Sequence, residues 1–149
     1  MGWTNSHLHQ FIKDETFYTI RMKDDDFWDE MRNVDYKKMR VSELLEVEKD
    51  KIVYEYDFGD SWEHDIILEK IIRENKDLEG PVCIAGKSNC PPEDCGGVWG
   101  YKRMLNVLKN PKHKSYQEIM RWIGGRFDPE YFNKEEVNRL LKKRNFGCP

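Results

Sequence analysis

KIVYEYDFGDSWEHDIIL, residues 51–68, is the stretch of this chain that decides the fold. Apolar and polar residues alternate from Ile52 to Phe58, which predicts a strand over residues 51–58. Gly59, Asp60 and Ser61 have turn-forming chemistry. Alternation resumes over residues 62–72. We therefore expect two antiparallel strands joined by a tight turn.

The residues before this hairpin predict more of the same sheet. Residues 7–12 and 17–22 also alternate, and residues 13–16 between them are polar, which predicts a second hairpin with a four-residue loop. The charged residues 23–38 predict a loop or short helix, and Ser42 is expected to cap a short helix that includes Leu44 and Leu45.

Helical spacing of apolar residues replaces alternation after a Gly-, Pro- and Cys-rich loop, residues 80–97. The expected helices cover residues 98–109, residues 115–123 with Gly124-Gly125 at the end, and a segment that Asn133 and Glu136 open as an N-cap pair. Strands followed by helices indicate one α+β domain over residues 1–149, with an antiparallel sheet of about four strands packed against the C-terminal helices.

The charge balance argues against a general attraction to phosphate backbones. Lysine and arginine number 25 and aspartate and glutamate 28, a net charge of −3. Two local clusters are basic: Lys102, Arg103, Lys109, Lys112, His113 and Lys114, and Arg139, Lys142, Lys143 and Arg144. They are either solvated helix faces or nucleic-acid contacts. No run approaches the ~18 apolar residues of a membrane span, so we expect a cytoplasmic protein without a membrane partner.

Carboxylates crowd the end of the hairpin, and like charges this close need a cation, protons or solvent. With the downstream run CPPEDCGG, residues 90–97, they define a candidate binding surface: Asp57, Asp60, Trp62, Glu63, His64, Glu93 and Asp94. The alternative is that the acids stabilise turns and that His64 is a core histidine bonded to a backbone group or to Asp60. Gly96-Gly97 could cradle an anion, or Asp94 could cap the helix that follows.

A divalent metal, zinc above all, is a second interpretation. His7 and His9 share one strand face, so their imidazoles could reach one ion. The candidate ligands are His7, His9, Asp60, His64, Cys83, Cys90 and Cys95. The cysteines lack the tight CxxC pairs of structural zinc sites, and ordinary thiols remain the alternative. A Cys90–Cys95 disulfide would be unexpected in the cytosol.

Several motifs together resemble the plasmid pRiA4b ORF-3-like family. They are Gly2-Trp3-x3-His7-Leu8-His9-x-Phe11, residues 54–64, residues 90–97, Gly100-Tyr101, Phe127-Asp128-Pro129-Glu130-x-Phe132 and Val137-Asn138. The resemblance covers almost the whole chain and implies an α+β fold and a bacterial or archaeal origin. Members are often labelled as resolvase-like passengers of insertion elements, and the family provides no catalytic residues to carry over.

The residues do not support recombinase chemistry. A serine recombinase needs a nucleophilic serine among arginines, whereas Ser61 lies among acids. Family members usually have a further strand and helix before the Gly-Trp block, so we expect a shortened chain that pairs with another copy or dissolves poorly.

Three hypotheses follow. The first is a binding or interaction module, associated with mobile elements, for a protein partner or a small ligand. The second is a metal-dependent hydrolase with an ion among Asp57, Asp60, His64 and His7 or His9. The third is a nucleic-acid-binding accessory protein that uses the basic helical segments.

Overall fold

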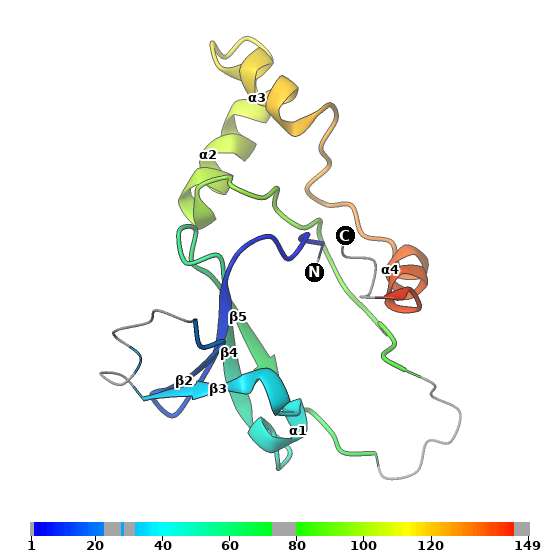
Figure 1. Ribbon diagram of the computed structural model, residues 1–149. Helices are drawn as coiled ribbons and strands as arrows, with labels where there is room; N and C mark the ends of the chain where they lie inside the picture. Colours follow the sequence, from blue (N-terminus) through cyan, green and yellow to red (C-terminus); the bar gives the residue numbers. More distant parts are fainter. Residues whose placement is uncertain (1, 23–27, 29–31, 73–79, 145–149) are drawn as a thin grey trace. The chain divides into compact units, whose positions relative to one another are not determined.

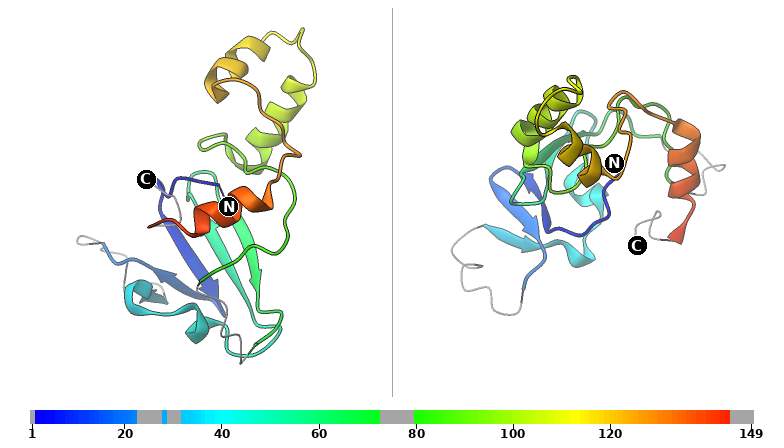
Figure 2. Two further views of the ribbon diagram at one scale, coloured as in Figure 1. Left: turned by 90° about the vertical axis from the view of Figure 1, so that its right-hand side faces the viewer. Right: turned by 90° about the horizontal axis from the view of Figure 1, so that it is seen from above.

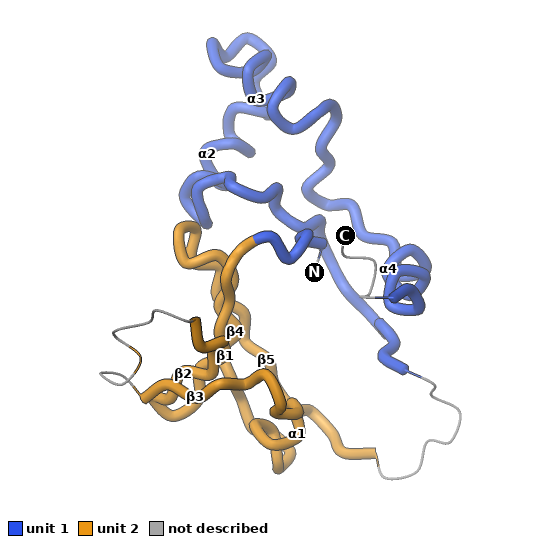
Figure 3. The backbone as a smooth tube through the Cα atoms, in the orientation of Figure 1, with its two compact units in different colours: residues 1–6, 75–149 blue, residues 7–74 orange. Residues whose placement is uncertain are grey.

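The computed structural model describes residues 2–22, 28, 32–72 and 80–144 (Figure 1). The chain divides into two compact units, which Figure 3 colours separately. We call residues 7–74 the sheet unit, and residues 1–6 with 75–149 the helical unit. The α+β class agrees with the sequence, and the prediction that residues 1–149 form one domain stays a prediction.

The sheet unit contains one five-stranded sheet with the order β3-β2-β1-β4-β5. Its strands are β1 (His9–Lys13), β2 (Thr16–Thr19), β3 (Asn33–Asp35), β4 (Lys51–Tyr56) and β5 (Trp62–Ile67). All neighbours are antiparallel except β2 and β3, which are parallel. The expected count of about four strands was therefore one short, because β3 is only three residues long and shows no readable alternation.

The hairpin of residues 51–67 is antiparallel, as predicted. Tyr54 pairs with His64 and Tyr56 with Trp62. Ile52 and Tyr56 point to one face and are each only 1% exposed, so they form the centre of this unit's core. The first strand stops two residues earlier than expected, because Asp57 turns the chain with φ 58°. The second strand ends at Ile67 and not at residue 72.

The β1–β2 hairpin is also confirmed, but its loop is shorter than the four residues expected. Lys13 pairs with Thr16, so only Asp14 and Glu15 remain in the turn. Both have positive φ, 49° and 60°, as a type I′ hairpin turn requires.

The segment between β3 and β4 contains two short helices, and the cap of the second differs from the expectation. Residues Tyr36–Lys38 form the 3-10 helix η2, and α1 spans Val41–Leu44. Arg40, not Ser42, is the N-cap of α1, and the Glu43 carboxylate accepts a hydrogen bond from the Arg40 backbone N–H. Ser42 lies inside the first turn, where its side chain cannot cap. The remainder of the segment predicted as loop or helix, residues 23–27 and 29–31, lies outside the described residues.

The helical unit carries three helices, α2 (Gly97–Leu108), α3 (Tyr116–Ile123) and α4 (Lys134–Leu141). Helices α2 and α3 lie side by side and are joined by a short connection (Figures 1 and 2). Gly124 ends α3 with φ 79°, and the Asn133 side chain accepts a hydrogen bond from the Glu136 N–H, both as predicted. Among the helices that the structure describes, none combines the length and apolarity needed to cross a bilayer.

Candidate functional site

Asp57 is the most buried acid of the predicted binding surface, 8% exposed, and its carboxylate serves the turn that follows β4. Oδ1 accepts the backbone N–H of Gly59 at 3.0 Å and of Asp60 at 3.4 Å. The Asp57 carbonyl accepts the Ser61 N–H at 2.6 Å. The side chain therefore replaces backbone partners that this turn would otherwise lack, which is the structural role considered as the alternative.

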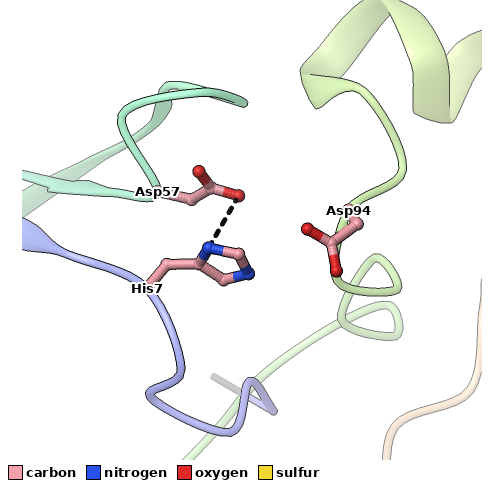
Figure 4. A group of neighbouring side chains, drawn as sticks. All are labelled: His7, Asp57 and Asp94. Atoms are coloured by element: carbon pink, nitrogen blue, oxygen red, sulfur yellow. Dashed lines mark ion pairs between the residues drawn. The ribbon is translucent and has the colours of Figure 1, made fainter.

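His7 lies beside this turn. Its Nδ1 is 3.7 Å from Asp57 Oδ2, an ion pair when the imidazole is protonated (Figure 4). Its ring also meets the Tyr56 ring edge-on, with centroids 5.9 Å apart. Asp94, drawn in the same figure, belongs to the helical unit. The sheet unit thus brings together His7 and Asp57, which the metal hypothesis had grouped, and their role as ligands stays a prediction.

The other acids of the hairpin do not converge. Glu63 is exposed and neighbours His64 in β5, so the two point to opposite faces of the sheet. Asp65, on the same side as Glu63, pairs with Lys51 at 2.9 Å. His64 Nδ1 lies 3.2 Å from the Tyr54 carbonyl oxygen. The interpretation of His64 as a histidine bonded to a backbone group is the one that fits this geometry.

His9 has a partner that the sequence did not indicate. The Tyr36 hydroxyl is 2.6 Å from His9 Nε2, and burial, then the nearby Asp35, raises the pKa of Tyr36. Tyr36 therefore keeps its proton, and its hydroxyl shares one hydrogen bond with His9 Nε2, in which the donor depends on the imidazole tautomer. His9 Nδ1 is buried without a hydrogen-bond partner among the described residues. The ring is further enclosed by Phe11 and Tyr54.

These contacts weaken the metal interpretation of the sheet. His9 Nε2 is engaged by Tyr36, and His64 Nδ1 by Tyr54. Among the described residues, neither unit by itself places three His, Cys, Asp or Glu side chains close enough to share an ion. A divalent metal, and with it the hydrolase hypothesis, stays a prediction.

In the helical unit, Glu93 is a clamp on the N-terminal segment. Its Oε1 accepts the Thr4 N–H at 2.8 Å and the Thr4 hydroxyl at 3.0 Å. The Trp3 indole N–H donates to the Pro91 carbonyl at 2.9 Å. The Gly-Trp motif and the CPPEDCGG motif are thus two sides of one contact. Asp94 is exposed, and the N-cap residue of α2 is Gly96 with φ 86°.

The structure describes three cysteines of this unit, Cys83, Cys90 and Cys95, and all three are half-buried. Burial raises the pKa of Cys90, which disfavours the thiolate that a metal or a nucleophilic reaction needs. Cys83 is fixed by Asn138, whose amide accepts the Cys83 N–H at 2.8 Å and donates to the Cys83 carbonyl at 3.0 Å. Ordinary structural thiols are the interpretation that these surroundings favour.

One surface in the helical unit offers exposed side chains around hollows. Trp99, Lys102, Arg103 and Asn106 follow one another at helical spacing along α2, and we call them the α2 stripe. With Val107 and His113 they line a hollow of about 370 Å³. The sequence had singled out Lys102, Arg103 and His113 as basic, but neither Trp99 before them nor Asn106 between them.

A larger groove of about 620 Å³ adjoins the stripe between α2 and α3. Its lining includes the buried side chains of Met104 and Val107, 4% and 6% exposed, together with Ile119 and Trp122. Arg103 contributes to both hollows. Both volumes fall in the range of about 300–1,000 Å³ that is usual for ligand sites.

Comparison with known proteins identifies the relatives. The model of the family described as plasmid pRiA4b ORF-3-like protein matches residues 1–136. The chain belongs to this family. A curated relative, "Uncharacterized protein y4hQ" of Sinorhizobium fredii, is 36% identical over 143 residues, which cover 95% of this chain and 71% of that protein.

A solved structure has a fold similar to that of this pRiA4b ORF-3-like protein. The crystal structure of the protein of unknown function MM3350 from Methanosarcina mazei Go1 matches with a TM-score of 0.73 and 39% identity. The match covers 91% of this chain and 75% of that one. The relatives are themselves uncharacterised, so the family supports no specific function.

Proposed function

We propose that this protein is a binding module whose helical unit holds a polyanionic partner on α2 and the segment that leads into α3. The observation that carries the proposal is charge segregation. Residues 97–123 contain six lysine and arginine residues against one glutamate, a net charge of +5. The rest of the chain then holds 19 basic and 27 acidic residues, a net charge of −8.

The basic side chains of this segment are displayed to solvent. Lys102, Arg103, Lys109, Lys112, His113 and Lys114 are all exposed. A solvated helix face normally mixes both signs, which lowers its self-repulsion. The segment's six lysine and arginine charges, which include Arg121, repel one another, and this repulsion is relieved when an anionic partner binds. The second basic cluster differs, because Arg139 follows Glu135 and Glu136 on α4.

The acidic candidates fit a scaffold role better than a ligand site. The Asp57 carboxylate accepts hydrogen bonds from two backbone N–H groups, and Glu93 accepts two from Thr4. A carboxylate engaged this way has fewer lone pairs for a ligand. Binding through the acidic surface therefore ranks below binding through the basic segment.

The test is binding of the whole 149-residue chain to immobilised long-chain polyphosphate, measured by interferometry between ~50 and ~200 mM salt. Affinity should fall steeply with salt, because each phosphate contact releases counterions. The double variant Lys102→Glu with Arg103→Glu should abolish most binding. The matched control, Lys134→Glu with Lys142→Glu, changes the net charge equally but lies on α4 and should retain it.

Two results would overturn the proposal. One is absence of binding at ~50 mM salt, where electrostatic attraction is strong. The other is equal loss in the α2 and α4 variants, which would mean that total charge, and not the α2 surface, determines affinity.

A further inference from the structure

Trp99 is the least expected residue of the α2 stripe. Its side chain is 80% exposed, although a tryptophan usually buries most of its surface. The Lys102 ammonium lies 5.7 Å from the ring centroid, a cation–π distance, which keeps a positive charge beside the exposed indole. An exposed flat ring flanked by cations is the arrangement on which nucleic-acid bases stack.

The remaining stripe residues extend this arrangement along one face of α2. Arg103 and Asn106 are four and seven residues after Trp99, so all lie on the same side of the helix. Arg103 can bind a phosphate oxygen, and the Asn106 amide can both donate to and accept from a base edge. The hollow that these residues share, about 370 Å³, adjoins the ring.

His113 completes the hollow from the α2–α3 connection. The Ser115 backbone N–H donates to His113 Nδ1 at 3.1 Å. With Nδ1 accepting, the proton of the neutral imidazole is on Nε2, where it can be donated to a phosphate or a sugar oxygen.

We propose that the polyanion bound here is single-stranded nucleic acid, with an unpaired base stacked on Trp99 and the backbone phosphates held by Lys102 and Arg103. This inference rests on the proposed function and adds the chemical class of the partner. Phosphates alone would use the lysines and arginines, so only a base gives Trp99 a role.

Two other polyanions fit less well. In a duplex the bases are already stacked on one another, so no base face is offered to an exposed indole. An acidic peptide would anchor through apolar side chains in apolar pockets. The surface of the hollow around Trp99 is mostly apolar, but much of it belongs to side chains that end in a charged or polar group, and Val107 is its one aliphatic lining residue. A peptide would fit the neighbouring groove over Met104 and Ile119 better.

The experiment compares probes that share phosphates but differ in bases. Fluorescein-labelled oligo(dT), oligo(U), an abasic oligomer of equal length and a duplex are titrated with the whole chain, and anisotropy is recorded. Oligo(dT) or oligo(U) should bind more tightly than the abasic strand and the duplex, and the comparison of the two separates DNA from RNA.

Variants then assign the difference to the indole. Trp99→Ala should weaken oligo(dT) or oligo(U) binding by about 5- to 150-fold, the usual loss of one stacked base, and leave the abasic strand unchanged. Trp122→Ala is the matched control, since Trp122 is 49% exposed and lies in the groove between α2 and α3. It should bind like the unmodified protein.

The outcomes separate this inference from the proposed function. If polyphosphate and the abasic strand bind as tightly as oligo(dT) and oligo(U), or if Trp99→Ala has no effect, the base-stacking inference is wrong and polyanion binding survives. Tighter binding of an oligoglutamate than of the oligonucleotides also overturns it, in favour of an acidic peptide. If no polyanion binds, both fail.

Discussion

The start of α2 depends on a backbone contact that only glycine allows at position 100. A Cβ atom added to Gly100 would lie 1.9 Å from the Cys95 carbonyl oxygen and 2.8 Å from its carbonyl carbon. Actual Cβ atoms almost never come closer than 3.0 Å to another heavy atom. Gly100→Ala must therefore displace either the Cys95 peptide or the first turn of α2, which also carries Trp99.

Two opposing effects, helix propensity and overpacking, determine whether Gly100→Ala raises or lowers the free energy of unfolding. In a helix, alanine is favoured over glycine by about 1 kcal/mol. Overpacking costs about 1–3 kcal/mol, and the upper end applies because the obstacle is backbone and cannot rotate away. We expect a net loss of about 2 kcal/mol in the free energy of unfolding, which corresponds to a melting temperature lower by about 4–8 °C.

Urea unfolding followed by far-ultraviolet circular dichroism measures this change, because the signal reports helix. Gly80→Ala is the matched control: no atom lies within 4 Å of its added Cβ, so stability should stay within about 0.5 kcal/mol. A Gly100→Ala protein as stable as the unmodified chain, or more stable by the propensity difference, would refute the reasoning. It would mean that the loop before α2 yields at no cost.

Three further predictions concern the supports of the two units. Hydrogen bonds from backbone N–H groups to the Asp50 carboxylate lower its pKa below the ordinary value of 3.8. The charged carboxylate therefore stabilises the fold above pH 3.8, and this stabilisation is lost as the pH falls through the lower pKa of the folded state. Asp50→Asn should reduce the urea midpoint at pH 7, and the difference from the unmodified protein should vanish in acid. Asn138→Ala leaves the Cys83 N–H and carbonyl without their partner and should cost about 1–3 kcal/mol in the same assay, while an unchanged midpoint would contradict it. Tyr36→Phe should lower the free energy of unfolding by about 1 kcal/mol in the unmodified protein, but by little in a His9→Phe background, because the hydrogen bond needs both side chains. Additive losses in a double-mutant cycle would disprove the coupling.

Sequence reasoning succeeded where the decisive interactions are local. The β4–β5 hairpin follows from alternation over Ile52–Tyr56 and from turn residues that the chain itself supplies. The Asn133 cap is visible for the same reason, since its partner Glu136 is three residues away. Strand β3 shows the limit: three residues carry no periodicity, and its pairing with β2 is set by tertiary structure.

The candidate site was only partly readable for a related reason. For His64 the sequence left a backbone group, Asp60 and a ligand open, and only the structure shows that Nδ1 lies beside the carbonyl of Tyr54, its strand partner. The Tyr36–His9 hydrogen bond joins residues 27 positions apart, and no sequence pattern predicts it. The α2 stripe could have been found, because Trp99, Lys102 and Arg103 share one helical face in the sequence. Only the structure shows that the Trp99 indole on this face is exposed, which makes the face a candidate binding surface.

Several motif residues of this chain supply hydrogen-bond partners for the long irregular segment, residues 80–96. A segment with no helix or sheet ladder must satisfy its backbone groups through other partners. Trp3 serves the Pro91 carbonyl, Asn138 serves both backbone groups of Cys83, and Asn89 is tied to residues 128–129.

Glu93 belongs to the same set of supports, since it fastens Thr4 to this loop. The motif residues are therefore the ones that keep this loop in one conformation. The ordered loop in turn fixes the position where α2 starts, at Gly96. The acidic and cysteine-rich motif residues support a surface whose exposed chemistry lies one turn further along, at Trp99 and Lys102. A substitution at Glu93 should then weaken binding through loss of order in the loop, whereas one at Trp99 removes a contact and leaves the fold unchanged.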